Sequence, residues 1–119
     1  MIDLTNKKVL LGVSGSIAAY KSPDLVRRLK DRGAHVRVVL TASAEKLVSP
    51  TVFHAVSGEP VRGDLWDEQA EAAMGHIELA KWADMVVIAP ATANVIAQLA
   101  NGTADSLLST LCLATEAPI

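Results

Sequence analysis

The sequence is poor in aromatic residues and has one cysteine, Cys112, among its 119 residues. A single cysteine cannot form an internal disulfide, and no residues near it have the spacing of a metal site. Basic charge is not in excess either: the formal net charge is -2, and the scattered Lys and Arg residues make nucleic acid a poor candidate partner. No apolar run reaches the ~18 residues that a membrane span needs, and the first residues lack the apolar core of a signal peptide. We therefore expect one small cytoplasmic domain with no metal, membrane or nucleic-acid partner.

Short apolar segments alternate along the chain with amphipathic ones. Residues 8–13 (KVLLGV), 35–40 (HVRVVL) and 85–90 (MVVIAP) are almost continuously apolar, which is typical of parallel strands covered on both faces. The amphipathic segment between the first two predicts a helix, which Pro23 should kink, or restart with Ser22 as its N-cap. A strand, a helix and a strand in this order favour a right-handed crossover.

The segments that follow are less regular. Residues 43–58 predict either one helix broken at Ser49-Pro50 or two short helices. Residues 59–66 (EPVRGDLW) are a candidate for a short third strand. The acidic, small-residue segment 67–75 (DEQAEAAMG) is predicted to form a loop.

The C-terminal part of the sequence predicts three helices. One spans residues 76–84, and two follow the strand at residues 85–90, with a break at Asn101-Gly102. The chain stops at Ile119, where the pattern calls for another strand, so we expect it to be part of a longer protein. Together the segments predict an α/β fold, a three-layer Rossmann-like (flavodoxin-like) parallel sheet with helices on both faces, truncated after the fourth main strand region.

The first turn, Ser14 to Ser16 in the stretch LLGVSGSIAAYK, follows the first predicted strand. In an open parallel sheet, ligands bind where the strands end, and helix N-termini favour anions. The turn lacks the glycine spacing of a dinucleotide site and the lysine of a nucleoside triphosphate loop, so both are disfavoured. Its hydroxyls suit a single terminal phosphate, such as that of flavin mononucleotide (FMN). A tight turn and helix cap without a ligand is an equally good interpretation of this stretch alone.

Two further turns have a similar composition. Thr41, Ala42 and Ser43 follow the second strand, and residues 90–94 (PATAN) follow the last predicted strand. Because the carboxyl ends of parallel strands meet at one edge of a sheet, three such turns predict one shared pocket. Each turn alone is also a good helix cap, with Thr41 or Ser43 and Thr92 as the cap residues, and the turns could serve both purposes.

Three stretches carry a resemblance to a known family: GVSGSIAAYKSP, VVLTASAEKLVSP and AEAAMGHIELAKWADMVVIAPATANVIAQLANGTADSLLSTLCLAT. In order and spacing they resemble the N-terminal half of the bacterial bifunctional coenzyme A biosynthesis flavoproteins, in which phosphopantothenoylcysteine decarboxylase is fused to phosphopantothenate-cysteine ligase. The resemblance covers residues 7–119 and implies that residues 1–119 are the N-terminal part of a flavin-binding decarboxylase domain. It also implies an FMN-dependent lyase that decarboxylates the cysteine moiety of 4'-phospho-N-pantothenoylcysteine to 4'-phosphopantetheine, in homotrimers or assemblies of trimers.

The resemblance also assigns roles to residues. In the family the flavin oxidises the cysteine moiety before carbon dioxide leaves, and the active-site histidine matches His76. The residues that match the three FMN-binding turns of the family are Gly15, Ser16, Ile17, Thr41, Ala42, Ser43, Thr92, Ala93, Asn94 and Val95.

His76 follows Gly75 and begins a predicted helix, whose positive end disfavours a charged imidazole. We therefore expect a neutral ring that can accept a proton, either as the base for the substrate thiol or as a group that orients the carboxylate. A capping or surface histidine is the alternative that the residues alone favour. His35 and His54 are expected to be structural.

The cysteine and the tryptophans are expected to have structural roles. The family's substrate-binding asparagine segment and its flap cysteine correspond to positions beyond residue 119, so we expect incomplete turnover from these residues alone. Cys112 lies among leucines and is expected to be a core thiol. Trp82 is expected to pack against the sheet or a neighbouring subunit, and Trp66 to be an oligomer contact.

Two other functions remain open at this point. A flavin prenyltransferase-like or other non-decarboxylating FMN-binding relative would share the phosphate turns but not the stretch GHIELAKWAD. A regulatory flavoprotein subunit would keep the fold for binding alone, and His76 would then be dispensable.

Overall fold

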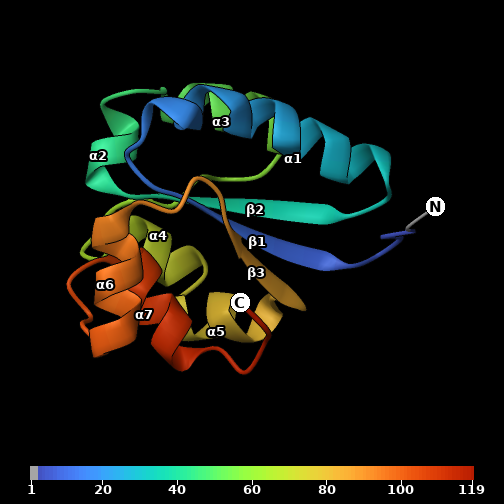
Figure 1. The fold of residues 1–119 in the computed structure, drawn as a ribbon. Coiled ribbons are helices and arrows are strands. Elements are labelled where there is room, and N and C mark those ends of the chain that lie inside the picture. The colour runs from blue at the N-terminus through green and yellow to red at the C-terminus, as the bar shows by residue number, and fades with distance from the viewer. Residues whose placement is uncertain (1–2) are drawn as a thin grey trace.

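The computed structural model describes residues 3–119, and its centre is a parallel sheet of three strands in the order β2-β1-β3 (Figure 1). β1 spans Lys8–Val13, β2 spans His35–Leu40 and β3 spans Met85–Ile88. Each strand coincides with one of the three continuous apolar runs in the sequence, so the parallel α/β sheet is confirmed.

Helices cover both faces of this sheet (Figure 1). On one face lie α1 (Ser22–Asp31) and α3 (Pro50–Ser57), and on the other lie α5 (His76–Trp82) and α7 (Leu107–Ala114). The side chains of β1 alternate between the two layers: Leu11 and Val13 belong to the hydrophobic core with α1 and α3, whereas Leu10 belongs to the core with α5 and α7. The three predicted layers are therefore present.

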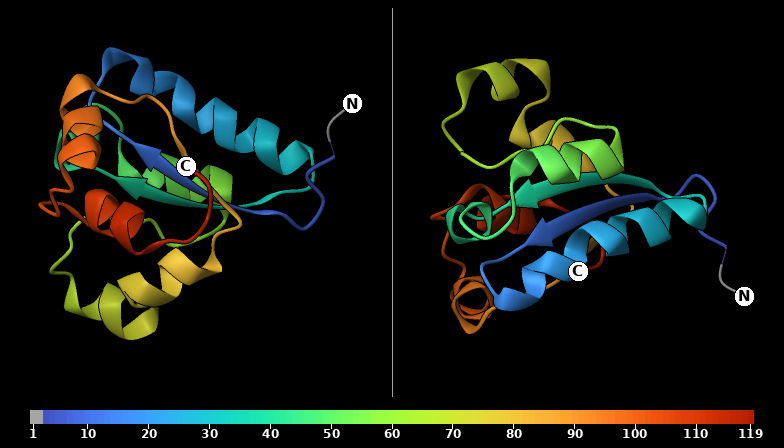
Figure 2. Two further views of the ribbon diagram at one scale, coloured as in Figure 1. Left: turned by 60° about the horizontal axis from the view of Figure 1, so that its bottom comes forward. Right: turned by 90° about the horizontal axis from the view of Figure 1, so that it is seen from above.

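The strands end together at one edge of the sheet. Gly12 of β1 pairs in parallel with Val39 of β2 and with Ile88 of β3. Figure 2 shows from above how α1 and α3 lie side by side, and the Lys30 Nζ of α1 donates a hydrogen bond of 2.9 Å to the Ser57 carbonyl of α3. Two helices with small residues at their starts, α2 (Ala42–Glu45) and α6 (Ala93–Asn101), lie at the carboxyl end of the sheet (Figure 1).

The expected strand over residues 59–66 is wrong in extent. Only Arg62 pairs with β2: its N–H donates to the Val38 carbonyl at 3.0 Å, and its carbonyl accepts from the Leu40 N–H at 2.8 Å. Pro60 has no N–H to extend the pairing on one side, and Gly63 gives a strand little support on the other. β3 is consequently the third strand of the described sheet rather than the fourth.

The predicted loop over residues 67–75 is also wrong. It contains α4 (Glu68–Ala73), whose first turn is capped by the Asp67 side chain, which accepts from the Ala70 N–H at 3.0 Å. Alanine and glutamate favour helix, and the cap satisfies an N–H that has no partner within the helix.

The remaining helices follow the predictions closely. After a short 3-10 helix η1 (Ile17–Lys21), the helix after β1 restarts with Pro23 in its first turn, but it begins at Ser22, so its N-cap is Lys21 and not Ser22. The Ser22 hydroxyl instead donates to the Ala89 carbonyl at 2.9 Å, which ties α1 to the end of β3. Residues 43–58 hold two short helices, α2 and α3, and α6 ends at Gly102 in the left-handed conformation.

The segment after α7 runs beside β3, where the Val86 N–H donates to the Pro118 carbonyl at 2.9 Å. Within residues 3–119, no helix is both long enough and apolar enough to cross a membrane.

Candidate functional site

The three turns that follow β1, β2 and β3 meet at one hollow of about 340 Å³. Seven of the ten residues expected to hold FMN line it: Gly15, Thr41, Ala42, Ser43, Thr92, Asn94 and Val95. Gln98, Asp105 and Ser106 complete the lining, and sequence reasoning did not select them. The convergence of the turns, which the parallel strand ends predicted, is therefore present.

Gly15 brings the first turn into direct contact with the second. A Cβ atom built on Gly15 would lie 2.3 Å from Ser43 Cβ and 3.0 Å from the Ser43 carbonyl carbon. No side chain fits in that space, so the close approach of these two turns requires glycine.

Ser14 joins the first turn to the third. Its side chain is fully buried, its hydroxyl donates to the Pro90 carbonyl, and the same oxygen accepts from the Thr92 N–H at 2.9 Å. Ser14 is part of the first turn in the sequence but was not among the residues expected in the site. Its position directly after a strand and before a glycine is the sequence feature that could have indicated its role.

The threonines of the second and third turns are helix caps as well as lining residues. Thr41 Oγ1 accepts from the Ala44 N–H at 3.2 Å, and Thr92 Oγ1 accepts from the Val95 N–H at 3.2 Å. The earlier N–H groups of each helix have no acceptor within the helix and attract an anion. Thr41 and Thr92 are therefore helix caps and lining residues of the hollow at the same time.

Three of the expected FMN-binding residues lie outside the hollow's lining. Ser16 caps η1 through a hydrogen bond of 3.3 Å from the Ala18 N–H to its hydroxyl. Ile17 projects into solvent, and Ala93 is the exposed first residue of α6.

His76 lines a second hollow of about 360 Å³, together with Trp66, Glu71 and Thr110. A hollow of about 390 Å³ lies between the two, because it shares Thr41 with the first and Trp66 with the second. His76 is therefore not at the turns themselves but at the far end of a row of adjoining hollows.

Glu71, the fourth residue of α4, contacts His76 through both of its carboxylate oxygens. Its Oε1 pairs with His76 Nδ1, and its Oε2 accepts from the His76 backbone N–H at 2.8 Å. The hydrogen bond from His76 is the main reason that the pKa of Glu71 lies below its ordinary value. The helix start at His76 is visible in the sequence, whereas its contact with this carboxylate is not.

Arg62 completes the cluster from the segment beside β2. Its Nη2 lies 3.2 Å from Glu71 Oε2, and its Nη1 donates to the Met74 carbonyl at 2.6 Å. Its side chain is 8% exposed, so the guanidinium is held in place by packing as well as by hydrogen bonds. Glu71 reaches Arg62 and His76 from α4. Because the sequence predicted a loop over these residues, it did not predict these contacts.

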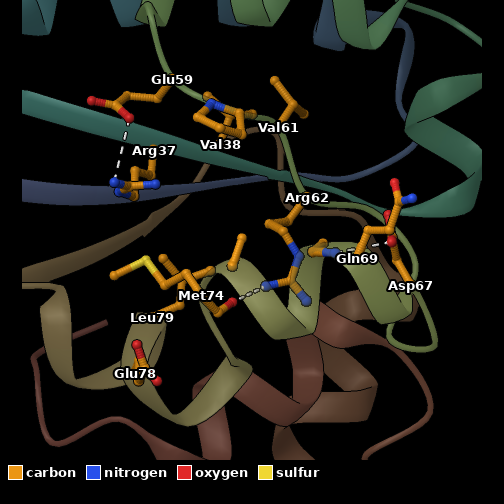
Figure 3. A pocket seen from close by; sticks show the side chains of 13 residues that line it. Arg37, Val38, Glu59, Val61, Arg62, Asp67, Gln69, Met74, Glu78 and Leu79 are labelled. Carbon is orange, nitrogen blue, oxygen red and sulfur yellow. Dashed lines mark hydrogen bonds and ion pairs between the residues drawn. The ribbon is translucent and has the colours of Figure 1, made fainter.

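A larger hollow of about 640 Å³ lies on the other side of Arg62, next to β2 (Figure 3). Its charged side chains are partly paired: Arg37 lies 3.3 Å from Glu59, and Arg62 faces the Met74 carbonyl. No residue proposed from the sequence for FMN binding or catalysis lines this hollow.

Cys112 is buried in the core with α5 and α7, and this burial raises the pKa of its thiol. Its expected role as a core thiol is confirmed. Trp82 packs against the same core, with the Arg37 guanidinium 5.3 Å from its ring centroid, whereas Trp66 is exposed. Within residues 3–119, no three metal-ligating side chains gather in one group.

The sequence pattern of the family described as Flavoprotein matches residues 2–118. This chain belongs to the flavoprotein family. Among curated proteins, the flavoprotein chain is 60% identical over 118 residues to the coenzyme A biosynthesis bifunctional protein CoaBC of Escherichia coli (strain K12), and 49% identical over 116 residues to that of Bacillus subtilis (strain 168). The alignments cover 99% and 98% of this chain but 29% of each relative, so the chain spans less than a third of their length.

Solved structures agree with this family. The FMN-dependent cysteine decarboxylase SpaF has a TM-score of 0.86 at 36% identity, over 97% of the flavoprotein chain and 66% of that chain. A PPC decarboxylase variant complexed with pantothenoylaminoethenethiol has a TM-score of 0.73 at 32% identity, over 93% of this chain and 62% of that one. The expected flavodoxin-like fold is thus confirmed.

Proposed function

We propose that this chain binds FMN in the hollow at the strand ends and forms part of a phosphopantothenoylcysteine decarboxylase. The reaction would remove the carboxylate from the cysteine moiety of 4'-phospho-N-pantothenoylcysteine and so give 4'-phosphopantetheine in coenzyme A biosynthesis. The observation that carries the proposal is the contact of Gly15 with Ser43 beside the Thr92 cap, which gathers three polar turns around one hollow. The names of the bifunctional relatives and of the decarboxylase structures support the same activity.

The lining fits a phosphomonoester. Hydroxyl groups and helix N–H groups are hydrogen-bond donors to phosphate oxygens, and the glycine turn allows a close approach to the backbone. Asp105 adds a carboxylate that would repel a phosphate, so we place the phosphate at the turns of Gly15 and Thr41. Ser16, Ile17 and Ala93 remain in the proposed site because they directly adjoin lining residues.

Decarboxylation needs an electron sink next to the carboxylate, and the cysteine moiety of the substrate does not have one. Bound FMN would supply the two-electron oxidation that creates it. His76 would act on the substrate, as the base for its thiol or as the group that orients its carboxylate. Its place in the row of hollows, away from the phosphate turns, suits a role at the substrate and not at the cofactor's phosphate.

We also propose that the chain assembles as a homotrimer, or as a set of trimers, in the cytoplasm. Three apolar side chains near the strand ends support an interface there: Ile17, Tyr20 and Ile96 are 82%, 65% and 55% exposed. Apolar surface of this kind is typical of contact between copies of a chain.

The test uses the complete gene product, so that any segment outside these residues is present. We expect a flavin absorption spectrum after purification and release of carbon dioxide from 4'-phospho-N-pantothenoylcysteine. Bound flavin without carbon dioxide release would favour a prenyltransferase-like or regulatory relative. Absence of flavin after reconstitution with FMN would contradict the proposed site itself.

A further inference from the structure

The contacts of Glu71 determine which nitrogen of His76 carries a proton. The hydrogen bond from His76 keeps the pKa of Glu71 below its ordinary value, so its carboxylate is ionised at neutral pH. An ionised carboxylate has no proton to donate, and the paired Nδ1 must therefore be the donor. In the neutral ring, Nε2 is then unprotonated and can accept a hydrogen bond or a proton from a molecule in the hollow.

Two further contacts fix the position of the ring. Glu71 Oε2 accepts from the His76 backbone N–H, so one carboxylate holds both the main chain and the ring of the same residue. Arg62 binds that carboxylate and the Met74 carbonyl, which anchors both ends of the segment from Glu71 to Met74. A buried guanidinium with these partners leaves Glu71 little freedom to turn away.

We propose that Glu71 is a positioning residue for His76, and that Arg62 in turn holds Glu71. Its carboxylate fixes the imidazole with Nδ1 protonated and Nε2 directed at the substrate, in the manner of a carboxylate behind a catalytic histidine. This inference rests on the proposed role of His76 in decarboxylation. It adds Glu71 to the residues expected from the sequence, although Glu71 lies in a segment predicted to be a loop.

The surroundings of His76 offer a matched control. Glu71 contacts His76, Arg62 on the segment beside β2 binds Glu71, and the first turn of α4 also carries Glu68. Glu68 lines the same hollow, and within the described part of the chain its side chain makes no hydrogen bond to His76. Glu68→Gln therefore removes the same charge from the same helix without removing a partner of the imidazole.

The experiment compares Glu71→Gln, Glu68→Gln and His76→Asn, with the Glu71→Gln/His76→Asn double variant, in the complete gene product loaded with FMN. The first readout is kcat and KM for 4'-phospho-N-pantothenoylcysteine. We expect Glu71→Gln to lower kcat by about tenfold to a hundredfold with little change in KM, because a mispositioned base loses part of its effect. In the His76→Asn background the same change should have no further effect, and in the presence of His76 the loss of kcat should be larger for Glu71→Gln than for Glu68→Gln.

The second readout needs no turnover. Long-range ¹H–¹⁵N NMR spectra of the histidine rings distinguish the Nδ1–H form of the neutral ring from the Nε2–H form. In the wild type we expect the Nδ1–H form of His76. Glu71→Gln should give a mixture of both forms, because a glutamine amide can donate to Nδ1 as well as accept from it, whereas Glu68→Gln should keep the wild-type form. Glu71→Asp keeps the charge with a shorter reach, and it replaces Glu71→Gln in both readouts if that variant does not fold.

The two readouts separate this inference from the proposed function. An unchanged kcat and an unchanged His76 tautomer in Glu71→Gln would overturn the positioning role while leaving the decarboxylase intact. An equal loss of kcat in the presence and absence of His76 would also overturn it, since Glu71 would then act on the fold. If the wild type releases no carbon dioxide, the proposed function fails, and the tautomer of His76 still decides whether Glu71 controls the ring.

Discussion

The Ser14 hydroxyl accepts a hydrogen bond from the Thr92 N–H at 2.9 Å, joining the turn after β1 to the turn after β3. The same hydroxyl donates to the Pro90 carbonyl, and Ser14 is fully buried. A side chain that both donates and accepts between two turns fixes their separation. The shape of the hollow therefore depends on Ser14, although Ser14 does not line it.

Ser14→Ala should lower both stability and flavin affinity. It leaves the half-buried Thr92 N–H without its acceptor, which costs about 1 kcal/mol of unfolding free energy. We expect a lower urea midpoint and weaker FMN binding in fluorescence titrations of the complete gene product. Ser49→Ala is the matched control, because Ser49 caps α3 and is not among the lining residues of the hollow. It should lower stability without changing FMN affinity, and an equal loss of affinity in both variants would contradict this role of Ser14.

Gly15→Ala should weaken FMN binding because the new methyl group meets Ser43 at 2.3 Å. The two turns must then move apart, and we expect an affinity lower by about tenfold or more. Adding Ser43→Gly removes the atom that collides and should restore part of the affinity. Gly75→Ala, where the nearest atom lies at 3.6 Å, should bind FMN as the wild type does. Normal binding by Gly15→Ala would show that the turns are not held as the structure has them.

Much of the sheet and of its polar edge could be predicted from the sequence because the signals are local. Continuous apolar runs identify β1, β2 and β3, and small residues with hydroxyls directly after them identify the turns. Parallel strands then require the turns to meet. Seven of ten residues expected to hold FMN accordingly line one hollow, whereas Ile17 projects into solvent because a 3-10 helix begins there.

The contacts around His76 could not be predicted from the sequence, because they join residues from two segments whose structure the sequence did not indicate. Arg62 reaches it from a single bridge to β2, where sequence reasoning expected a longer strand. Glu71 reaches it only because α4 forms in a segment that resembles an acidic loop. The side-chain cap by Asp67 is the feature that decides the helix, and an aspartate before an alanine- and glutamate-rich stretch was the signal for it.

Glu71 should contribute stability that disappears in acid. Its pKa in the folded protein lies below its ordinary value of 4.5, so folding favours the ionised form. The resulting stabilisation is fully present above about pH 4.5 and is lost as the pH falls through the lower, folded pKa. The difference in unfolding free energy between the wild type and Glu71→Gln, from urea titrations, should therefore be constant near neutral pH and shrink below about pH 4.5. Glu68→Gln serves as the comparison, and a difference that grew on acidification would have the wrong sign.

Cys112 should be dispensable for decarboxylation. It is buried in the core with α5 and α7, and its raised pKa keeps the thiol protonated at neutral pH. We expect Cys112→Ser to lower the unfolding free energy by about 1–3 kcal/mol, because it places a hydroxyl in an apolar site. The rate per folded molecule should stay unchanged. Labelling with a thiol reagent, read from the mass of the peptide that contains Cys112, should be slow in the native protein and fast in denaturant. A loss of activity greater than the loss of folded protein would assign Cys112 a chemical role.

His76→Asn should retain FMN and lose decarboxylation. Asparagine can still occupy the start of α5, but it cannot accept a proton as an imidazole does, and general acid-base catalysis contributes about 10²–10⁴ in rate. The yellow absorption should persist because His76 does not line the hollow at the strand ends. His54→Asn is the matched control: His54 Nδ1 lies 2.9 Å from the Glu59 carbonyl on the other helical layer, and its replacement should leave the rate unchanged. Turnover by His76→Asn at the wild-type rate would remove His76 from the reaction, whereas loss of flavin from the same variant would show that the row of hollows acts as one site.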